Sequence, residues 1–376
     1  MIVQRQCSLR CRGVLWLCLF TLIGNQPGAI ACTVVRFNAD GHLVIARNHD
    51  WPFGEGMLVV NQRGIQKTAL SAINPQRWTS RYGSVSMVQF GREIPFAGMN
   101  ERGLTVDLLQ LLDAQFPAPG PDVASVNAVQ WVQYQLDTAA TVEEVISSLQ
   151  RVVPAPMLPV VERVHYFVTD ASGDVAVIEF LAGQAVVQHG TDAAQCALAN
   201  STWDQSSQAL ESDSPQRIAE RRYVEAVQAI GQMPSTASAL EQVQFAFETL
   251  DRVAQPDLTQ WSLVYEPAER RIWFQTEVAP RRRWIDLDDV SFEPTSPTLG
   301  LDLNADLAGD IASHLAPYTE QDNQRIVHFS FGRLMPEGMA RTAVKQLILN
   351  YPATLQIGTE PNASPAGVPS GAVSAE

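Results

Sequence analysis

Residues 32–51 read CTVVRFNADGHLVIARNHDW. Two runs rich in apolar and β-branched residues, 33–37 and 42–47, flank the segment Asn38-Ala39-Asp40-Gly41. Asp-Gly supplies residues that tolerate the positive φ angles of a tight hairpin turn. The stretch therefore predicts an antiparallel β-hairpin whose first strand starts directly after a cysteine, Cys32.

The chain in front of this cysteine has the pattern of a secretory signal peptide. Arginines among residues 5–12 precede an apolar run at 14–23, and Ala-Ile-Ala at 29–31 forms a small-x-small cleavage site. The apolar run is shorter than the roughly 20 residues that a transmembrane helix needs. We expect residues 1–31 to be removed, which predicts a periplasmic or secreted protein with no stable membrane anchor.

A cysteine at a cleavage site has two uses. In a bacterial lipoprotein it is acylated, and the chain would then be a non-catalytic periplasmic lipoprotein. The acylating enzyme prefers Leu, Val or Ile at the position where Ala29 stands. Ordinary cleavage instead leaves Cys32 with a free α-amino group, and the small residues favour this interpretation, with the lipoprotein as the alternative of another class.

An N-terminal cysteine carries a nucleophile and a base on one residue. The α-amino group has a pKa of roughly 8 and the thiol a pKa of roughly 8.5, so both are partly in the useful state near neutral pH. A neighbouring cation would favour the thiolate, while the amine can accept the thiol proton and pass it to a leaving nitrogen. This chemistry is that of an N-terminal nucleophile (Ntn) amide hydrolase.

The composition excludes several other classes of function. The formal net charge is −14, and the loss of the leader arginines makes it more negative, which disfavours nucleic acid as a partner. Only Cys32 and Cys196 of the five cysteines follow the leader, so no disulfide framework is expected. The six histidines form no zinc-binding spacing, and no glycine-rich phosphate loop is present. We expect neither a metal nor a cofactor.

The rest of the chain alternates groups of short strands with pairs of helices. Such an order, without regular βαβ crossovers, favours an α+β fold of antiparallel sheets with helices layered outside. The patterns predict a domain over residues 32–355 and a disordered tail at 356–376, which is rich in small residues, Pro and Gly. Helices are expected over 126–136, 141–152, 215–230 and 237–253.

Several motifs along the chain resemble those of the choloylglycine hydrolases, which include conjugated bile acid hydrolases and penicillin V acylases. The resemblance implies an Ntn αββα sandwich, a small-molecule acyl amide as substrate and a homotetrameric assembly. Its most specific part is the opening block, because the cysteine, the hairpin and R-N-x-D arrive at the family's spacing. The matching segments are CTVVRFNADGHLVIARNHDW, FAGMNERGL, LANSTWD, SDSPQRIAERRY and TQWSLVYEP.

The resemblance also implies roles for individual residues. Cys32 matches the nucleophile, Arg47 the arginine beside it, and Asp50 the carboxylate that binds the α-amino group. Asn200 in LANSTWD matches the oxyanion asparagine, although Thr202 stands where the family carries a proline.

Two of these matches depend on local geometry. In a strand, residues 47 and 49 share one face, so a turn starting near Asn48 would be needed to bring Asp50 round to Arg47. Arg217 in SPQRIAERRY matches the family's S-x-x-R-F arginine, although Arg221 and Arg222 follow one turn later and compete for the same role.

Two further residues bear on the substrate. Gln110 stands where bile acid hydrolases carry an asparagine and penicillin acylases an aromatic residue, so it is either an oxyanion donor or part of the pocket wall. Trp51 resembles the Gram-negative branch and offers a flat apolar wall to the acyl group. We predict hydrolysis of linear amides such as penicillin V or N-acyl homoserine lactones, with conjugated bile acid hydrolysis as the alternative.

Overall fold

The computed structural model describes residues 32–158, 162–190, 196–212 and 215–358. The expected signal peptide and residues 359–376 of the expected tail lie outside this part of the chain. Among the described helices, none combines the length and the apolar character needed to cross a membrane.

The predicted hairpin is confirmed. Strands β1 (Thr33–Ala39) and β2 (His42–Asp50) pair antiparallel, with Ala39 opposite His42. The two residues between them, Asp40 and Gly41, have φ angles of 51° and 76°, as the two-residue turn requires. Strand β2 continues to Asp50, so the expected turn near Asn48 is wrong.

The hairpin lies in a seven-stranded sheet, and each of its β1–β2, β2–β15 and β15–β16 pairs is antiparallel. The strand order is β14-β1-β2-β15-β16-β17-β19. The added strands are β14 (Ala197–Leu198), β15 (Thr259–Glu266), β16 (Arg271–Thr276), β17 (Arg283–Asp286) and β19 (Gly309–Asp310).

A second, nine-stranded sheet is antiparallel throughout its pairings, in the order β13-β12-β11-β8-β7-β6-β3-β18-β20. Its strands are β3 (Met57–Asn61), β6 (Ser84–Val88), β7 (Pro95–Asn100), β8 (Thr105–Gln110), β11 (Val164–Thr169), β12 (Val175–Leu181), β13 (Gln184–His189), β18 (Leu299–Asp302) and β20 (Ala316–Pro317). Smaller pairings join β9 (Ala124–Val126) to β10 (Val152–Pro154), and join β4 (Ile65–Thr68) to both β5 (Arg77–Thr79) and β21 (Gln356–Ile357).

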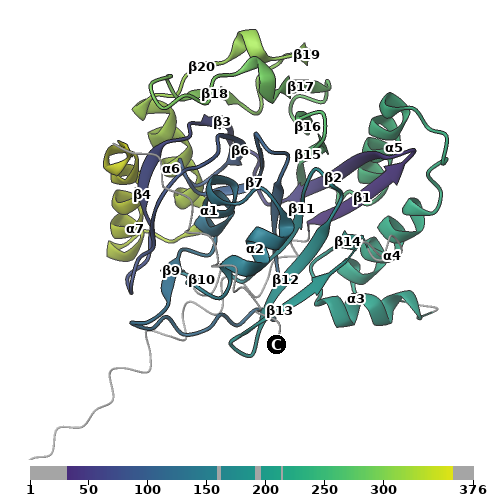
Figure 1. Ribbon diagram of the computed structural model, residues 1–376, viewed down its shortest axis with the longest axis horizontal. Coiled ribbons are helices and arrows are strands. Elements are labelled where there is room, and N and C mark those ends of the chain that lie inside the picture. The colour runs from purple at the N-terminus through teal and green to yellow at the C-terminus, as the bar shows by residue number, and fades with distance from the viewer. Residues whose placement is uncertain (1–31, 159–161, 191–195, 213–214, 359–376) are drawn as a thin grey trace, which may run out of the picture.

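Helices cover the outer faces of both sheets. Figure 1 shows the two sheets with the helices outside them. One apolar cluster lies between the sheets, and two further clusters pack the outer faces against helices. Helices α4 and α5 cover the seven-stranded sheet, while α1, α6 and α7 lie over the nine-stranded sheet. The arrangement confirms an α+β sandwich of the αββα type. The helices are α1 (Gln130–Thr138), α2 (Val142–Ser148), α3 (Trp203–Leu210), α4 (Ile218–Ile230), α5 (Ala239–Arg252), α6 (Glu320–Leu334) and α7 (Met339–Asn350).

The C-terminal part of the domain is more regular than the sequence patterns indicated. Helices α6 and α7 pack on each other, and β21 pairs with β4 just beyond the expected domain end at residue 355. Side chains on α6 also bond to the segment after β6, since Ser330 Oγ donates to the Gln89 carbonyl. The folded domain therefore extends through the strand at 356–357.

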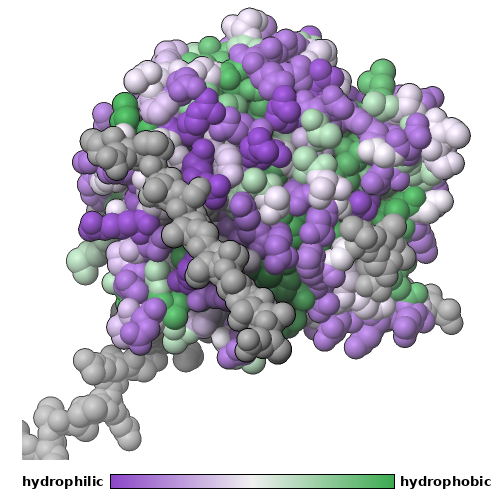
Figure 2. Space-filling model, viewed as in Figure 1, coloured by the Kyte–Doolittle hydropathy of each residue, from purple (hydrophilic) through white to green (hydrophobic). Residues whose placement is uncertain are grey.

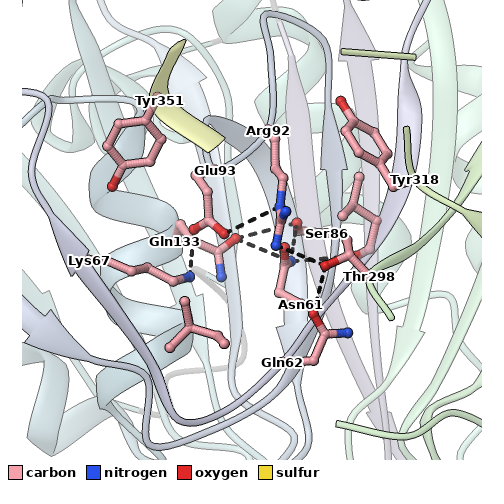
Figure 3. A network of polar contacts seen from close by, with 12 residues as sticks. Asn61, Gln62, Lys67, Ser86, Arg92, Glu93, Gln133, Thr298, Tyr318 and Tyr351 are labelled. Carbon is pink, nitrogen blue, oxygen red and sulfur yellow. Dashed lines mark hydrogen bonds and ion pairs between the residues drawn. The ribbon is translucent and has the colours of Figure 1, made fainter. Parts of the chain in front are cut away.

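A network of buried charged side chains joins strand β4, the segment between β6 and β7, and helix α1 (Figure 3). Lys67 Nζ lies 2.5 Å from Glu93 Oε2 and 2.8 Å from Asp137 Oδ2, with all three side chains almost fully buried. Arg92 Nε lies 3.8 Å from Glu93. Two cations thus face two carboxylates, which is the balance that burial requires.

Hydrophilic residues cover most of the surface that is visible in Figure 2.

Candidate active site

Cys32 lies at the start of the described chain, directly before β1, and its side chain is buried. Its Sγ lies 4.0 Å from the main-chain carbonyl oxygen of Asp50, at the far end of the neighbouring strand β2. Cys32 also lines a pocket that contains about 750 Å³ of empty space, part of it open to solvent. The hairpin thus places the thiol between the residues at the end of β2 and the pocket.

Arg47 projects from β2 and is fully buried beside the cysteine. Its guanidinium donates to two main-chain carbonyls, those of Phe96 at 2.6 Å and Leu108 at 2.8 Å. Its Nη1 lies 3.4 Å from Asp107 Oδ1. These contacts fix the guanidinium in the space between the two sheets, so it presents a positive charge to Cys32 without freedom to swing away.

Asp107 was not singled out by the sequence analysis. It is a fully buried acid in the otherwise apolar strand β8, and Tyr265 Oη donates to it at 3.3 Å. Burial raises its pKa to about 6, while Arg47 and the Tyr265 hydroxyl act in the opposite direction. The one sequence signal was a lone acid inside a strand of apolar residues, where a buried carboxylate needs a cationic partner.

His49 lies on the same face of β2 as Arg47 and lines the pocket. Arg47 Nη2 is 3.4 Å from His49 Nδ1, and an arginine can only donate, so Nδ1 is the acceptor. His49 Nε2 then carries the proton and faces Gln89 Oε1 at 3.4 Å. Burial, and then Arg47, hold the pKa of His49 well below its usual value. The imidazole is therefore neutral.

Asp50 approaches Cys32 from the other face of β2, opposite to Arg47 and His49. Its carboxylate accepts from Thr259 Oγ1 at 2.6 Å, and Arg222 Nη2 lies 3.1 Å from its Oδ2. Burial raises the pKa of Asp50 to about 6, against the lowering effects of Arg222, Thr259 and Arg47. Strand alternation thus places the two charged residues on opposite sides of the cysteine, and the sequence-based expectation of a shared side is wrong.

The arginine beside Asp50 is Arg222, not Arg217. Arg222 lies in α4 with only 7% of its side chain exposed, and it also donates to Thr33 Oγ1 and to the Val253 carbonyl. Arg217 is the residue before α4, its side chain is 60% exposed, and its contacts are with Gln205 and Glu220. The assignment of Arg217 to the nucleophile is therefore corrected to Arg222, which one turn of helix carries inward.

The environment of the thiol opposes its ionisation. Burial raises the pKa of Cys32 above its ordinary value, and the positive charges of Arg47 and Arg222 offset this only in part. Arg47 therefore acts in the expected direction, toward the thiolate, but burial has the larger effect on the pKa of Cys32. The thiol needs a base close by, and the α-amino group of the same residue would be that base once residues 1–31 are removed.

Asn200 follows strand β14 and lies next to the end of β8. Its Nδ2 donates to the Gln110 carbonyl oxygen at 2.6 Å. A primary amide has two N–H groups, so one remains to donate elsewhere. The Gln110 side chain lines the pocket together with Cys32. Asn200 thus contacts the main chain of a residue that lines the pocket of Cys32.

Thr202, which replaces the family's proline, has a definite structural role. Its hydroxyl accepts from the Gln205 main-chain N–H at 3.2 Å, and its own N–H donates to the Gln205 side chain. The two bonds form a capping box at the start of α3. A proline lacks the N–H, so this chain secures the loop after Asn200 by a helix cap instead.

The pocket beside Cys32 has mainly apolar walls. Trp51 lines it, and its ring packs edge-on against Phe90, with centroids 6.1 Å apart. The Trp51 indole N–H is buried without a hydrogen-bond partner in the described part of the chain. The C-terminal helices complete the wall, which the sequence analysis did not anticipate. Their lining residues are Phe331 and Leu334 from α6 and Val344 and Ile348 from α7.

Comparison with known proteins agrees with this arrangement. Residues 32–212 match the family model of linear amide C–N hydrolases, choloylglycine hydrolase family. A penicillin V acylase from Pectobacterium atrosepticum is 25% identical over 80% of this chain and 94% of its own length. The structure of penicillin V acylase from Agrobacterium tumefaciens has a TM-score of 0.68 and 24% identity, covering 77% of this chain and 98% of that one. A mutant conjugated bile acid hydrolase from Clostridium perfringens has a TM-score of 0.60 and 15% identity, covering 74% and 98%.

The αββα sandwich and the matched family model together define an enzyme that hydrolyses the C–N bond of linear amides. Residues 32–212 are similar to the choloylglycine hydrolase family, and the chain is a homologue of the penicillin V acylases.

Proposed function

We propose that the mature enzyme begins at Cys32 and removes the acyl group of penicillin V or of N-acyl homoserine lactones in the periplasm or outside the cell. The observation that carries the proposal is the pocket itself, because Cys32 opens into a space walled by Trp51, Phe90 and Phe96. Flat and extended apolar acyl groups bury well against aromatic rings. The similarity to a penicillin V acylase supports the same choice.

The proposed reaction starts with proton transfer from the Cys32 thiol to its own α-amino group. The sulfur then attacks the amide carbonyl carbon, and the carbonyl oxygen becomes an oxyanion that the free N–H of Asn200 stabilises. The α-ammonium returns its proton to the leaving nitrogen as the C–N bond breaks, which leaves a thioester on Cys32. Water, deprotonated by the α-amino group, hydrolyses that thioester and releases the acid.

The charged residues around the cysteine would hold these groups in place. We expect Asp50 to accept a hydrogen bond from the α-amino group, since the charge of its carboxylate already acts on the Cys32 thiol. Arg222 balances the negative charge of Asp50, and Asp107 balances that of Arg47. Each of these buried charges is thus paired with one of opposite sign, and a neutral amide would bind without leaving any of them unpaired.

Conjugated bile acid hydrolysis is the second candidate. Gln110 favours it, because an amide side chain at this position is closer to the asparagine of bile acid hydrolases than to an aromatic residue. Gln110 lines the pocket beside Cys32, where it is placed either to donate to the oxyanion or to contact the substrate.

The two candidates are separated by comparing kcat/KM for penicillin V, a long-chain N-acyl homoserine lactone and glycocholate. We expect the first two to be hydrolysed in preference to glycocholate. A clear preference for glycocholate would contradict the substrate proposal and leave the cysteine mechanism in place. Secretion by cleavage after Ala31 is tested by N-terminal sequencing of the periplasmic protein, and the homotetramer stays a prediction that light scattering would check.

A further inference from the structure

Glu162 is the only acidic residue among the side chains that line the pocket beside Cys32 in the described part of the chain. No lysine or arginine lines that pocket in the same part of the chain. The remaining polar groups on its wall are neutral: the amides of Gln110 and Asn127, and the uncharged imidazole of His49. When ionised, Glu162 is thus the one charged side chain among the described residues that line the pocket, while Arg47 lies behind His49 and Cys32.

The fold places the Glu162 carboxyl on the same pocket wall as Gln110, at the end of β8. Glu162 lies two residues before Val164, which is paired with Gln110 at the end of β8. The Leu111 N–H donates to the Arg163 carbonyl, so the strand pairing continues beside it. Glu162 itself precedes the strand, in a turn where its N–H donates to the Leu158 carbonyl, and both Glu162 and Val164 line the pocket.

The carboxyl is held firmly but retains free acceptor capacity. Asn127 Nδ2 and the Met157 N–H each donate to Oε2 at 2.8 Å. An ionised carboxylate has about four acceptor positions, so these bonds leave room for a further donor. Burial raises the pKa of Glu162 to about 7, against the lowering effect of these bonds and of the Leu158 N–H. A substrate donor would lower the cost of that burial.

From this geometry we propose that Glu162 is a specificity-determining residue, which accepts a hydrogen bond from a hydroxyl or amino group on the acyl part of the substrate and rejects acyl groups that carry a carboxylate. The proposal rests on the proposed function, since it requires the acyl group to occupy the pocket beside Cys32. It extends the substrate class from purely apolar acyl groups to acyl groups with one polar donor.

A purely structural role must be separated from this one. Asn127 Oδ1 accepts from the Val129 and Gln130 N–H groups at the start of α1, and Glu162 holds the same Asn127 side chain. Loss of Glu162 could therefore disturb α1 and lower the overall rate. A ratio of kcat/KM for two substrates on one variant is independent of the fraction of active enzyme, so it reports the pocket alone.

The test uses a set of phenoxyacetyl amides of one chromogenic amine at pH 8. The phenoxy ring is unsubstituted, carries a hydroxyl at the meta or para position, or carries a carboxylate at the meta or para position. For the natural chain we expect one hydroxylated substrate to exceed the unsubstituted one in kcat/KM by about tenfold. We expect the carboxylated substrates to fall below it by about a hundredfold. The same ratios are measured for Glu162→Gln, Glu162→Leu and Glu143→Gln, the last being a control on the exposed first turn of α2.

Glu162→Leu should bring the hydroxyl ratio close to one. Glu162→Gln should keep part of that ratio, because an amide oxygen still accepts, and should reduce the discrimination against the carboxylate at least tenfold. The proposal would be overturned if Glu162→Gln had the same kcat/KM ratios between substrates as the natural chain and Glu143→Gln. Glu162→Gln therefore decides the question even if Glu162→Leu does not fold. If none of the amides is hydrolysed and none acylates Cys32, the proposed function fails instead.

Discussion

Arg222 Nη2 lies 3.1 Å from Asp50 Oδ2, in an ion pair that joins helix α4 to the end of strand β2 beside the cysteine. The Arg222 guanidinium also donates to the hydroxyl of Thr33, the residue after Cys32. A single side chain thus connects the carboxylate, the first residue of β1 and, through the Val253 carbonyl, the end of α5. We infer that this connection helps to hold Cys32, the proposed nucleophile, in place.

We therefore expect Arg222→Gln to lower kcat/KM for penicillin V about a hundredfold or more, since it leaves Asp50 buried without its cation. Arg217→Gln is the matched control. Arg217 lies on the surface directly before the same helix, so its substitution should change kcat/KM less than about twofold. Equal losses in both variants, or a larger loss in Arg217→Gln, would show that the assignment of Arg222 is wrong.

The proposed role of Asn200 as an oxyanion donor leads to a second expectation. Asn200→Ala should reduce kcat by about a hundredfold with little change in KM, because the lost donor acts mainly in the transition state. Gln110→Ala should cost less, and should act mostly on KM if its side chain only lines the pocket. Unchanged kinetics for Asn200→Ala would remove this residue from the mechanism. Circular dichroism of both variants checks that the fold is retained.

The pKa of Asp50 predicts the acid side of the pH profile. Its pKa is raised by burial to about 6, so protonation below that pH removes the negative charge that Arg222 and the α-amino group face. Protonation of the α-amino base lowers kcat/KM first, and we expect a second, steeper fall as the pH decreases through about 6. Asp50→Asn should have low activity and should lose the second fall while it keeps the first. A wild-type profile that is flat from pH 7 to pH 4 would contradict the role of the carboxylate.

The buried network of Lys67 predicts a change in stability rather than in chemistry. Lys67→Met leaves Glu93 and Asp137 buried without their shared cation, which should cost about 3–5 kcal/mol of unfolding free energy at pH 8. The loss should be smaller at pH 5, because the pKa of Asp137 is already raised to about 6 by burial and the carboxyls take up protons there. Lys345→Met on α7 is the control. Denaturant unfolding at both pH values measures the difference, and a pH-independent loss would argue against this explanation.

Local sequence signals predicted the elements that local chemistry controls. The Asp40-Gly41 turn fixed the register of the hairpin, and with it the place of Cys32 beside Arg47. Arg217 was mistaken for Arg222 because a motif spacing does not tell which turn of a helix faces inward; Arg217 precedes α4, while Arg222 lies on its buried face.

The C-terminal helices were missed for a different reason. Helix α7 has one buried residue, Ile348, which belongs to the apolar cluster over the nine-stranded sheet and also lines the pocket. Such a helix has no strong amphipathic pattern to detect. Glu162 was likewise invisible, since a lone glutamate before a strand has the same sequence context whether it faces solvent or a pocket.

The proposed mechanism requires Cys32, with its free α-amino group, to be the nucleophile. Intact-mass analysis of the enzyme, quenched in acid during turnover of penicillin V, identifies the residue that is acylated. We expect a chain that starts at Cys32 and gains the mass of one phenoxyacetyl group on its sulfur, with no such gain in Cys32→Ala or in a form with one alanine added before Cys32. An acyl group on Cys196, or turnover by Cys32→Ala, would contradict it.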